Sequence, residues 1–143
     1  MKVLFTCGGT AGHINPAVAL AGMFRQRQNA EVLFVGADGG METTLVPREG
    51  YPVKTVTITS FYRSLSGAAI KHNLTTLKNL SRSRGQARAI LDEFQPDLVV
   101  GTGGYASYPV VREAARRGIP TAVHESNAEP GLTTKMLAKY VDK

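Results

Sequence analysis

A glycine-rich turn follows the first apolar run of the chain, in the stretch Val3-Leu4-Phe5-Thr6-Cys7-Gly8-Gly9-Thr10-Ala11-Gly12-His13. The same order recurs where Leu98-Val99-Val100 leads into Gly101-Thr102-Gly103-Gly104-Tyr105. In a parallel α/β sheet both turns lie at the carboxyl ends of strands, where such folds bind ligands. Glycine lets the backbone approach a ligand, and the free N–H groups at a helix start attract anions. The pair therefore predicts one site, lined from two sides, for a phosphorylated substrate.

Apolar and amphipathic segments alternate along the chain, which is typical of βαβ units and a mostly parallel sheet. The pattern predicts strands near 2–7, 31–35, 53–57, 97–101 and 120–124. It predicts helices near 15–28, 40–48, 70–94, 106–117 and 130–140, with Pro16 in the first turn of the first helix. Residues 59–69 show no clear period and are expected to form a loop. The predicted fold class is α/β, a Rossmann-like doubly wound parallel sheet.

The common doubly wound strand order, 3-2-1-4-5, makes the first and fourth strands neighbours. Both glycine turns then flank one crevice, and the turn His124-Glu125-Ser126-Asn127 after the fifth strand lies beside them.

His13 is either a general base or a residue that caps or packs a helix. Glu125 is either a second candidate base or a carboxylate that holds its loop by accepting backbone N–H groups. Asn127 either binds a sugar hydroxyl or caps the next helix, and Tyr105 either stacks on a sugar or packs. His124 is expected to support the site by hydrogen bonding.

The length of 143 residues, with 43% hydrophobic and 20% charged residues, favours one globular domain with its own core. The single cysteine, Cys7, excludes an internal disulfide and is expected to be a buried, inert thiol. No stretch is long enough for a signal peptide or a membrane span, so a soluble cytoplasmic protein is expected. The three scattered histidines lack metal-ligand spacing, and neither a metal nor another cofactor is expected.

The net charge of +6 comes from one segment of the chain. Residues 50–91 contain seven Lys or Arg residues and no Asp or Glu, whereas the rest of the chain is close to neutral. Such a patch suits phosphate, nucleic acid or an anionic membrane surface. Apolar residues interleaved with these cations favour the headgroup region of an anionic membrane. Nucleic acid is the weaker interpretation, because the aromatic residues form no recognised stacking motif.

The first turn differs from two familiar phosphate-binding motifs. His13 stands after Gly12 where a P-loop needs Lys, and the glycine spacing does not match G-x-G-x-x-G. Asp38, after the second strand, could still imitate the acid that binds a ribose. A dinucleotide-binding oxidoreductase domain is therefore an alternative hypothesis, which saturable NADH binding would support.

Four stretches resemble the N-terminal domain of the MurG family, the N-acetylglucosaminyltransferases that make lipid II in peptidoglycan synthesis. They are Gly8-Gly9-Thr10-Ala11-Gly12-His13 with Pro16, Leu45-Val46-Pro47, Gly101-Thr102-Gly103-Gly104-Tyr105-Ala106-Ser107, and His124-Glu125-Ser126-Asn127 with Pro130-Gly131-Leu132-Thr133. The resemblance covers essentially the whole chain and implies a GT-B fold of two Rossmann-like domains. It implies that residues 1–143 form the acceptor-binding domain and that the C-terminal donor-binding domain is absent from this chain. Ala11, Tyr108 and Ser126 stand where the family usually has Gly, Gly and Gln.

The resemblance also implies an activity, that of an inverting GT-B hexosyltransferase that needs no metal. The family transfers GlcNAc from UDP-GlcNAc to the C4 hydroxyl of MurNAc in undecaprenyl-pyrophosphoryl-MurNAc-pentapeptide (lipid I). The implied location is peripheral, on the cytoplasmic face of the plasma membrane, against its anionic inner leaflet. The isolated domain is expected to bind acceptor and membrane without turnover. A separate binding subunit that acts only with a catalytic partner chain is the alternative.

Site residues follow from the resemblance position by position. Acceptor and pyrophosphate contacts are implied for Gly8, Gly9, Gly12, Gly103, Gly104 and Tyr105. Donor contacts are implied for Thr10, Ala11, Gly12 and Asn127. His13 is the leading general base and Glu125 its competitor, and the choice between them stays open. The implied membrane-facing residues are Phe61, Arg63, Leu65, Ile70, Lys71, Leu74, Lys78 and Lys139.

Overall fold

The structure is a computed structural model that describes the backbone of residues 1–58 and 67–143. Side chains are described for residues 1–58, 78–79 and 81–143. Strands and helices alternate throughout the described chain. Their order is β1 (Lys2–Thr6), α1 (Ala11–Gln28), β2 (Glu31–Ala37), α2 (Glu42–Arg48), β3 (Val53–Val56), α3 (Gly67–Phe94), β4 (Leu98–Gly101), α4 (Ser107–Arg116), β5 (Thr121–Val123) and α5 (Leu132–Leu137).

The five strands form one parallel sheet in the order β3-β2-β1-β4-β5. The central strand is β1, which pairs Phe5 with Phe34 of β2 on one side and with Val100 of β4 on the other. This arrangement confirms the predicted α/β class and the predicted strand order. Because all strands run the same way, the turns after β1, β4 and β5 meet at one edge of the sheet.

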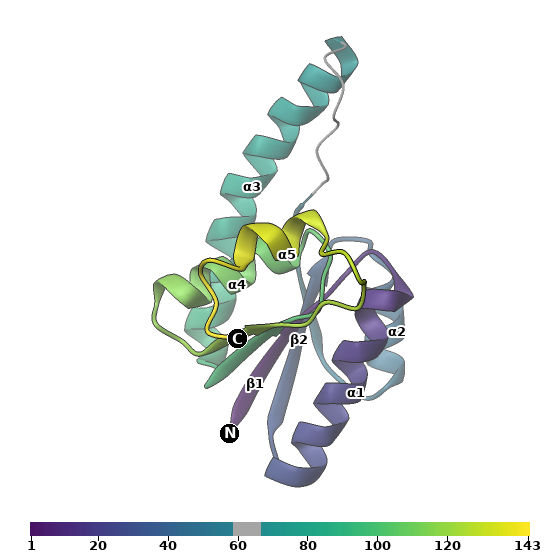
Figure 1. Ribbon diagram of the computed structural model, residues 1–143, viewed down its shortest axis with the longest axis vertical. Helices are drawn as coiled ribbons and strands as arrows, with labels where there is room; N and C mark the ends of the chain where they lie inside the picture. Colours follow the sequence, from purple (N-terminus) through teal and green to yellow (C-terminus); the bar gives the residue numbers. More distant parts are fainter. Residues whose placement is uncertain (59–66) are drawn as a thin grey trace.

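Helices cover both faces of the sheet (Figure 1). Neighbouring residues of a strand point to opposite faces, so Phe5 packs with the core under α1 and α2, and Leu4 packs with the core under α3, α4 and α5. Phe5 stacks on Phe34 with ring centroids 5.5 Å apart, and its edge meets Phe24 of α1 at 6.0 Å. These two apolar layers hold the strand ends, and therefore the turns, in a fixed arrangement.

The first helix begins earlier than the sequence pattern predicts. It starts at Ala11, so His13 lies in its first turn and Pro16 in its second, which corrects the placement of Pro16 in the first turn. A proline at this position cannot donate to the carbonyl of Gly12 four residues before it. The Gly12 carbonyl instead accepts a hydrogen bond from Ser126 Oγ at 3.3 Å. The lost helical bond is thus replaced by a link to the turn after β5.

The long third helix differs from its expectation at its start. It begins at Gly67, so residues 67–69 are helical although the sequence predicts a loop there, and residues 59–66 lie outside the described residues. The other end packs on the sheet through Ala87, Ile90 and Leu91, while the start projects beyond the rest of the domain (Figure 1). Among the residues that the structure describes, no helix is long and apolar enough to cross a membrane.

Candidate functional site

The two glycine turns touch each other. Gly103 and Gly104 both have φ in the left-handed region, at +119° and +89°. A Cβ on Gly104 would collide with the carbonyl oxygen of Gly8, and a Cβ on Gly103 would collide with the ring of His13. Thr102 Oγ1 adds a hydrogen bond to the His13 carbonyl at 2.5 Å. The predicted convergence of the two turns is therefore confirmed, and only glycine fits at both contact points.

Two helices begin in these turns with unoccupied N-terminal groups. Neither Thr10, before α1, nor Ala106, before α4, caps its helix with a side-chain hydrogen bond, and neither first turn contains an acidic residue. Within the described part of the chain, the N–H groups of Ala11, Gly12 and Tyr105 donate to no other group. The positive ends of two helix dipoles thus face the same edge, which is an arrangement that binds an anion.

A buried carboxylate lies beneath the first turn. Glu42, at the start of α2, is fully buried, and its Oε1 accepts the N–H of Ala37 at 2.7 Å. Its Oε2 accepts the N–H of Gly9 at 3.4 Å, so this N–H is directed into the protein. Three glycines leave no room for a Cβ beside this carboxyl group: Gly8, Gly36 and Gly40. The sequence analysis did not single out Glu42. The only sign of a buried side chain here was the set of glycines at the ends of β1 and β2, which leave space for it.

His13 is held by the turn from which it projects. Its Nδ1 lies 2.8 Å from the carbonyl oxygen of Gly8. A carbonyl oxygen only accepts, so in the neutral ring Nδ1 carries the proton and Nε2 keeps a free lone pair. His13 lines a pocket of about 180 Å³. The same pocket is lined by five further predicted site residues, namely Gly103, Gly104, Tyr105, Glu125 and Asn127.

Glu125 has both carboxylate oxygens occupied. Oε1 accepts the backbone N–H and the Nδ2 of Asn127, both at 3.0 Å. Oε2 accepts the N–H of Gly131 at 2.9 Å and Thr134 Oγ1 at 2.8 Å. The N–H groups of Gly131 and Asn127, followed by the Thr134 hydroxyl, lower the pKa of Glu125 to about 2. Such a carboxylate is a weak proton acceptor, and its contacts fasten the turn after β5 to the start of α5.

The remaining predicted residues are distributed around this pocket. Tyr105 is 42% exposed at its rim, and the four implied donor contacts, Thr10, Ala11, Gly12 and Asn127, are exposed at the same edge. The backbone N–H of His124 donates to the carbonyl oxygen of Gly101 at 2.8 Å, which ties the turn after β5 to the end of β4, and a supporting role for its ring stays a prediction.

Two further expectations concern Cys7 and Asp38. Cys7 is fully buried, as predicted, and burial, followed by the charge of Glu42, raises the pKa of its thiol to about 12. Asp38 accepts a hydrogen bond from Thr57 Oγ1 at 2.6 Å, and hydrogen bonds from Thr55 and Thr57 lower its pKa. Its carboxylate is therefore engaged with the segment at and after β3.

Part of the predicted membrane-facing set can be placed. Lys78 and Lys139 are exposed. Phe61, Arg63 and Leu65 lie outside the described residues, and Ile70, Lys71 and Leu74 belong to α3 with side chains outside the description.

The fold and the glycine turns together define the N-terminal domain of a GT-B glycosyltransferase. Residues 3–143 match the family described as "Glycosyltransferase family 28 N-terminal domain". The chain therefore belongs to glycosyltransferase family 28.

Individual relatives narrow the comparison. The UDP-N-acetylglucosamine--N-acetylmuramyl-(pentapeptide) pyrophosphoryl-undecaprenol N-acetylglucosamine transferase of Ruminiclostridium cellulolyticum is 49% identical over 142 residues, which cover 99% of this chain and 38% of that protein. The Bacillus subtilis protein of the same name is 44% identical over 144 residues, which cover 100% of this chain and 39% of that protein. The crystal structure of Acinetobacter baumannii MurG matches with a TM-score of 0.83 and 27% identity, over 99% of this chain and 40% of that one. The chain thus spans about 38% of the length of such relatives.

Proposed function

We propose that this chain is the acceptor-binding half of an inverting hexosyltransferase. The enzyme would transfer GlcNAc from UDP-GlcNAc to the C4 hydroxyl of MurNAc in undecaprenyl-pyrophosphoryl-MurNAc-pentapeptide, which forms lipid II for peptidoglycan. The names of the relatives from R. cellulolyticum and B. subtilis contain the same donor and acceptor, which supports this assignment. The donor-binding domain would come from the part of those proteins that this chain does not span.

The observation that carries the proposal is the meeting of two uncapped helix starts at the contact between Gly8 and Gly104. A pyrophosphate placed there would receive N–H groups from α1 and from the turn before α4, and no acidic residue of either first turn would repel it. The Gly9 N–H is directed toward Glu42. We therefore assign the anion to the Ala11–Gly12 and Gly104–Tyr105 amides in preference to that of Gly9.

His13 is the proposed general base. Its Nε2 would accept the proton of the C4 hydroxyl while that oxygen attacks the anomeric carbon of GlcNAc. The bond to UDP breaks on the opposite side, UDP leaves with the bonding electron pair, and inversion produces the β-1,4 linkage. Glu125 is proposed as a positioning residue, since its two oxygens are already engaged with the loop and α5.

Donor binding and membrane contact complete the proposal. The exposed residues Thr10, Ala11, Gly12 and Asn127 would meet the donor from the acceptor side of the cleft. The exposed cations Lys78 and Lys139 support a peripheral location against the anionic inner leaflet, on the cytoplasmic face of the plasma membrane.

Calorimetry of the 143-residue chain with a short-chain, water-soluble acceptor analogue bearing the pyrophosphate tests the binding half of the proposal. We expect saturable binding that inorganic pyrophosphate competes away. Ala11→Asp should abolish it, because an acid at the start of α1 suits the helix but repels the ligand. Ala19→Asp, an exposed position on the same helix, is the matched control. Absence of binding by a chain that circular dichroism shows to be folded would contradict the proposal.

A chimaera tests the catalytic half. Residues 1–143 replace the matching segment of the R. cellulolyticum relative, and the turnover of GlcNAc is measured. His13→Gln should lower kcat by about 10²–10⁴-fold, with the affinity for the acceptor nearly unchanged. Glu125→Gln should lower kcat much less. Loss of turnover in Glu125→Gln alone would assign the base to Glu125 instead.

A further inference from the structure

A second pocket lies between α3 and α4, outside the candidate site. Its volume is about 270 Å³. Its walls are Ser81 and Arg84 from α3, and Tyr108, Pro109, Arg112 and Arg116 from α4. The spacing of 108, 112 and 116 places these residues along one face of α4. None of these residues lines the pocket that contains His13, so the two pockets are separate.

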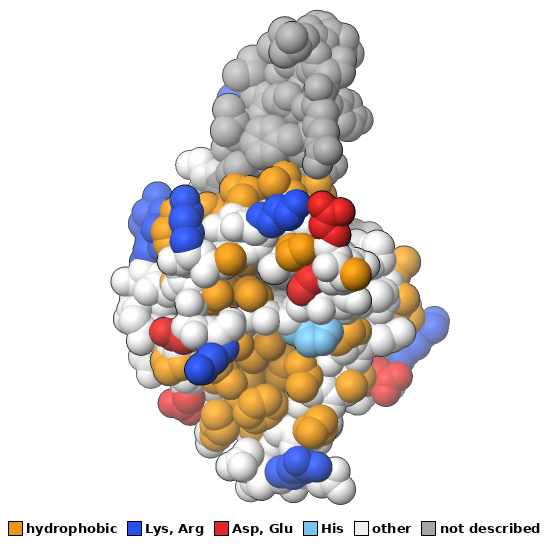
Figure 2. All heavy atoms as spheres, viewed as in Figure 1, with side chains coloured by type: hydrophobic (Ala, Val, Ile, Leu, Met, Phe, Trp, Pro, Cys, Tyr) orange, Lys and Arg blue, Asp and Glu red, His pale blue; other side chains and the backbone are white. Residues whose placement is uncertain are grey.

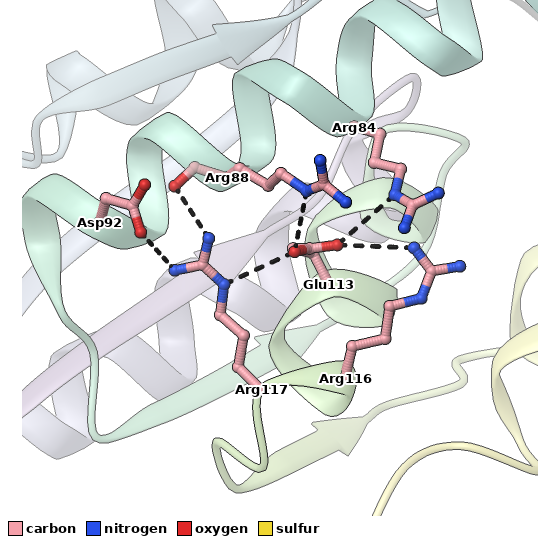
Figure 3. Close-up of polar contacts among 6 residues, drawn as sticks. All are labelled: Arg84, Arg88, Asp92, Glu113, Arg116 and Arg117. Atoms are coloured by element: carbon pink, nitrogen blue, oxygen red, sulfur yellow. Dashed lines mark hydrogen bonds and ion pairs between the residues drawn. The ribbon is translucent and has the colours of Figure 1, made fainter.

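A buried carboxylate holds two of these arginines in place. Glu113 is 6% exposed, and Figure 3 shows arginines of α3 and α4 around it. Arg84 Nε lies 3.7 Å and Arg116 Nη1 lies 3.5 Å from Glu113 Oε2. Both contacts are ion pairs, and Oε2 has no hydrogen-bond partner within the described chain. The hydrogen-bonding capacity of both guanidinium groups is therefore not consumed by Glu113.

The other carboxylate oxygen serves a different pair of arginines. Arg88 Nε donates to Glu113 Oε1 at 3.2 Å, and Arg117 Nε lies 3.5 Å from the same oxygen. Arg117 also reaches Asp92 at 2.6 Å. Burial raises the pKa of Glu113, but Arg88 and Arg117 lower it further than burial raises it, so Glu113 stays ionised. The carboxylates of Glu113 and Asp92 therefore neutralise only part of the positive charge of the four arginines that pair with them.

The third arginine of the pocket lies apart from Glu113. Arg112 stacks over the ring of Tyr140, with its guanidinium carbon 3.7 Å from the ring centroid. No acidic residue is among the described residues that line the pocket. Arg84, Arg112 and Arg116 thus converge on one cavity with an excess of positive charge. Figure 2 shows Lys and Arg side chains gathered on this side of the molecule, beside α3 and α4.

The geometry points to a binding site for a phosphate monoester or diester between α3 and α4. Guanidinium groups match phosphate oxygens in shape and charge, and their bonds to phosphate are charge-assisted. The pocket exceeds the size of one phosphate group, and Tyr108 and Pro109 offer an apolar wall to the esterified part. Packing of α3 on α4 explains Arg88 and Arg117, whereas Arg112 takes no part in the ion pairs of Glu113 and lies against the Tyr140 ring at the pocket wall. This inference does not rest on the proposed function.

Nuclear magnetic resonance of the 143-residue chain tests the site, with inorganic phosphate as the probe. The Nε–Hε signals of Arg84, Arg112 and Arg116 should shift saturably with phosphate and not with chloride at equal ionic strength. Arg112→Gln should weaken this binding about tenfold or more, because one charge-assisted donor is lost. Arg112 does not contact Glu113, so the α3–α4 network stays intact. Arg48→Gln, an exposed residue of α2 with the same charge change, should behave like the unaltered chain.

Two results would overturn the inference. The first is a shift of all arginine signals in proportion to ionic strength, and the second is unchanged phosphate binding in Arg112→Gln. Ser81→Asp provides a second variant, since it adds a carboxylate to the pocket wall without removing a contact, and it should also abolish binding. The Nε–Hε signals of the three pocket arginines report phosphate binding in this pocket only. A failure of the inferred phosphate site can therefore be distinguished from a failure of pyrophosphate binding at the glycine turns.

A vesicle experiment identifies the source of the phosphate. The chain is floated with phosphatidylcholine vesicles that contain or lack phosphatidylglycerol. If Arg112→Gln releases the chain from the anionic vesicles and Arg48→Gln does not, the ligand is a lipid headgroup. If both variants bind vesicles equally while only Arg112→Gln loses inorganic phosphate, the ligand is a soluble phosphate ester. Either result supports the site.

Discussion

Gly104 lies against Gly8 so closely that a Cβ on Gly104 would collide with the Gly8 carbonyl oxygen. The same carbonyl oxygen accepts the Nδ1–H of His13. One peptide group therefore joins the two glycine turns and also sets the tautomer of the histidine between them. The position of the candidate base depends on backbone contact between residues almost a hundred positions apart in sequence.

Replacement of Gly104 by alanine should destabilise the chain strongly. The left-handed backbone alone costs a non-glycine residue about 1–2 kcal/mol, and the collision with Gly8 adds to it. Gly118→Ala is the matched control, because its φ of +72° is similar and a Cβ there meets nothing within 4 Å. Urea unfolding should place Gly104→Ala well below Gly118→Ala in stability. Equal losses would show that the two turns can separate without a penalty.

Glu42 and Gly36 should behave as a coupled pair. Glu42→Ala removes a buried side chain and leaves the Ala37 N–H without its partner, for an expected loss of about 2–5 kcal/mol. Gly36→Ala should also destabilise, because its Cβ would collide with Glu42. In the double variant the new methyl group enters the space that Glu42 leaves. Unfolding experiments should therefore show a combined loss smaller than the sum, and strict additivity would contradict the packing described here.

The acid sensitivity of the chain should depend on Glu125. Its folded-state pKa of about 2 lies below the ordinary glutamate value of about 4.3. Its contribution to stability is then complete above about pH 4.3 and is lost as the pH falls toward 2. The stability difference between the unaltered chain and Glu125→Gln should shrink over this range. A carboxyl ¹³C titration of Glu125 with a midpoint near 4.3 would show that its four hydrogen bonds do not persist in solution.

Cys7 should resist alkylation in the native chain. With a pKa of about 12 the thiol is almost entirely protonated at neutral pH, and its side chain is fully buried. Iodoacetamide should modify it at a rate that rises with urea in parallel with unfolding. Modification of the native chain as fast as of the unfolded chain would mean that the end of β1 opens readily.

The sheet and the meeting of the turns were predictable from sequence, because they follow from periodicity and strand order. Gly8, Gly104 and Glu125 could each be assigned to a strand end, and parallel strands place those ends at one edge. The tie between Gly12 and Ser126 was not predictable, since it arises from the proline that interrupts α1. The start of α1 was expected too late in the chain because Pro16 is typical of a first helical turn, whereas the structure places it in the second.

Side-chain contacts within the site were beyond sequence reasoning. Glu125 had two interpretations because its hydrogen bonds to Gly131 and Thr134 depend on how the loop folds back to α5. Glu113 is a similar case. An acidic residue next to arginines on a short helix usually faces solvent, and only the packing of α3 on α4 buries it.

The carboxyl group of Glu42 occupies a space that three glycines leave open. Evolution can therefore change these four positions only together. In an alignment of relatives, a side chain at position 8, 36 or 40 should occur where position 42 carries a smaller residue, and sequences that retain the glutamate should retain all three glycines. The four positions would then vary together, although they lie in the turn after β1, in β2, in the turn after β2 and at the start of α2.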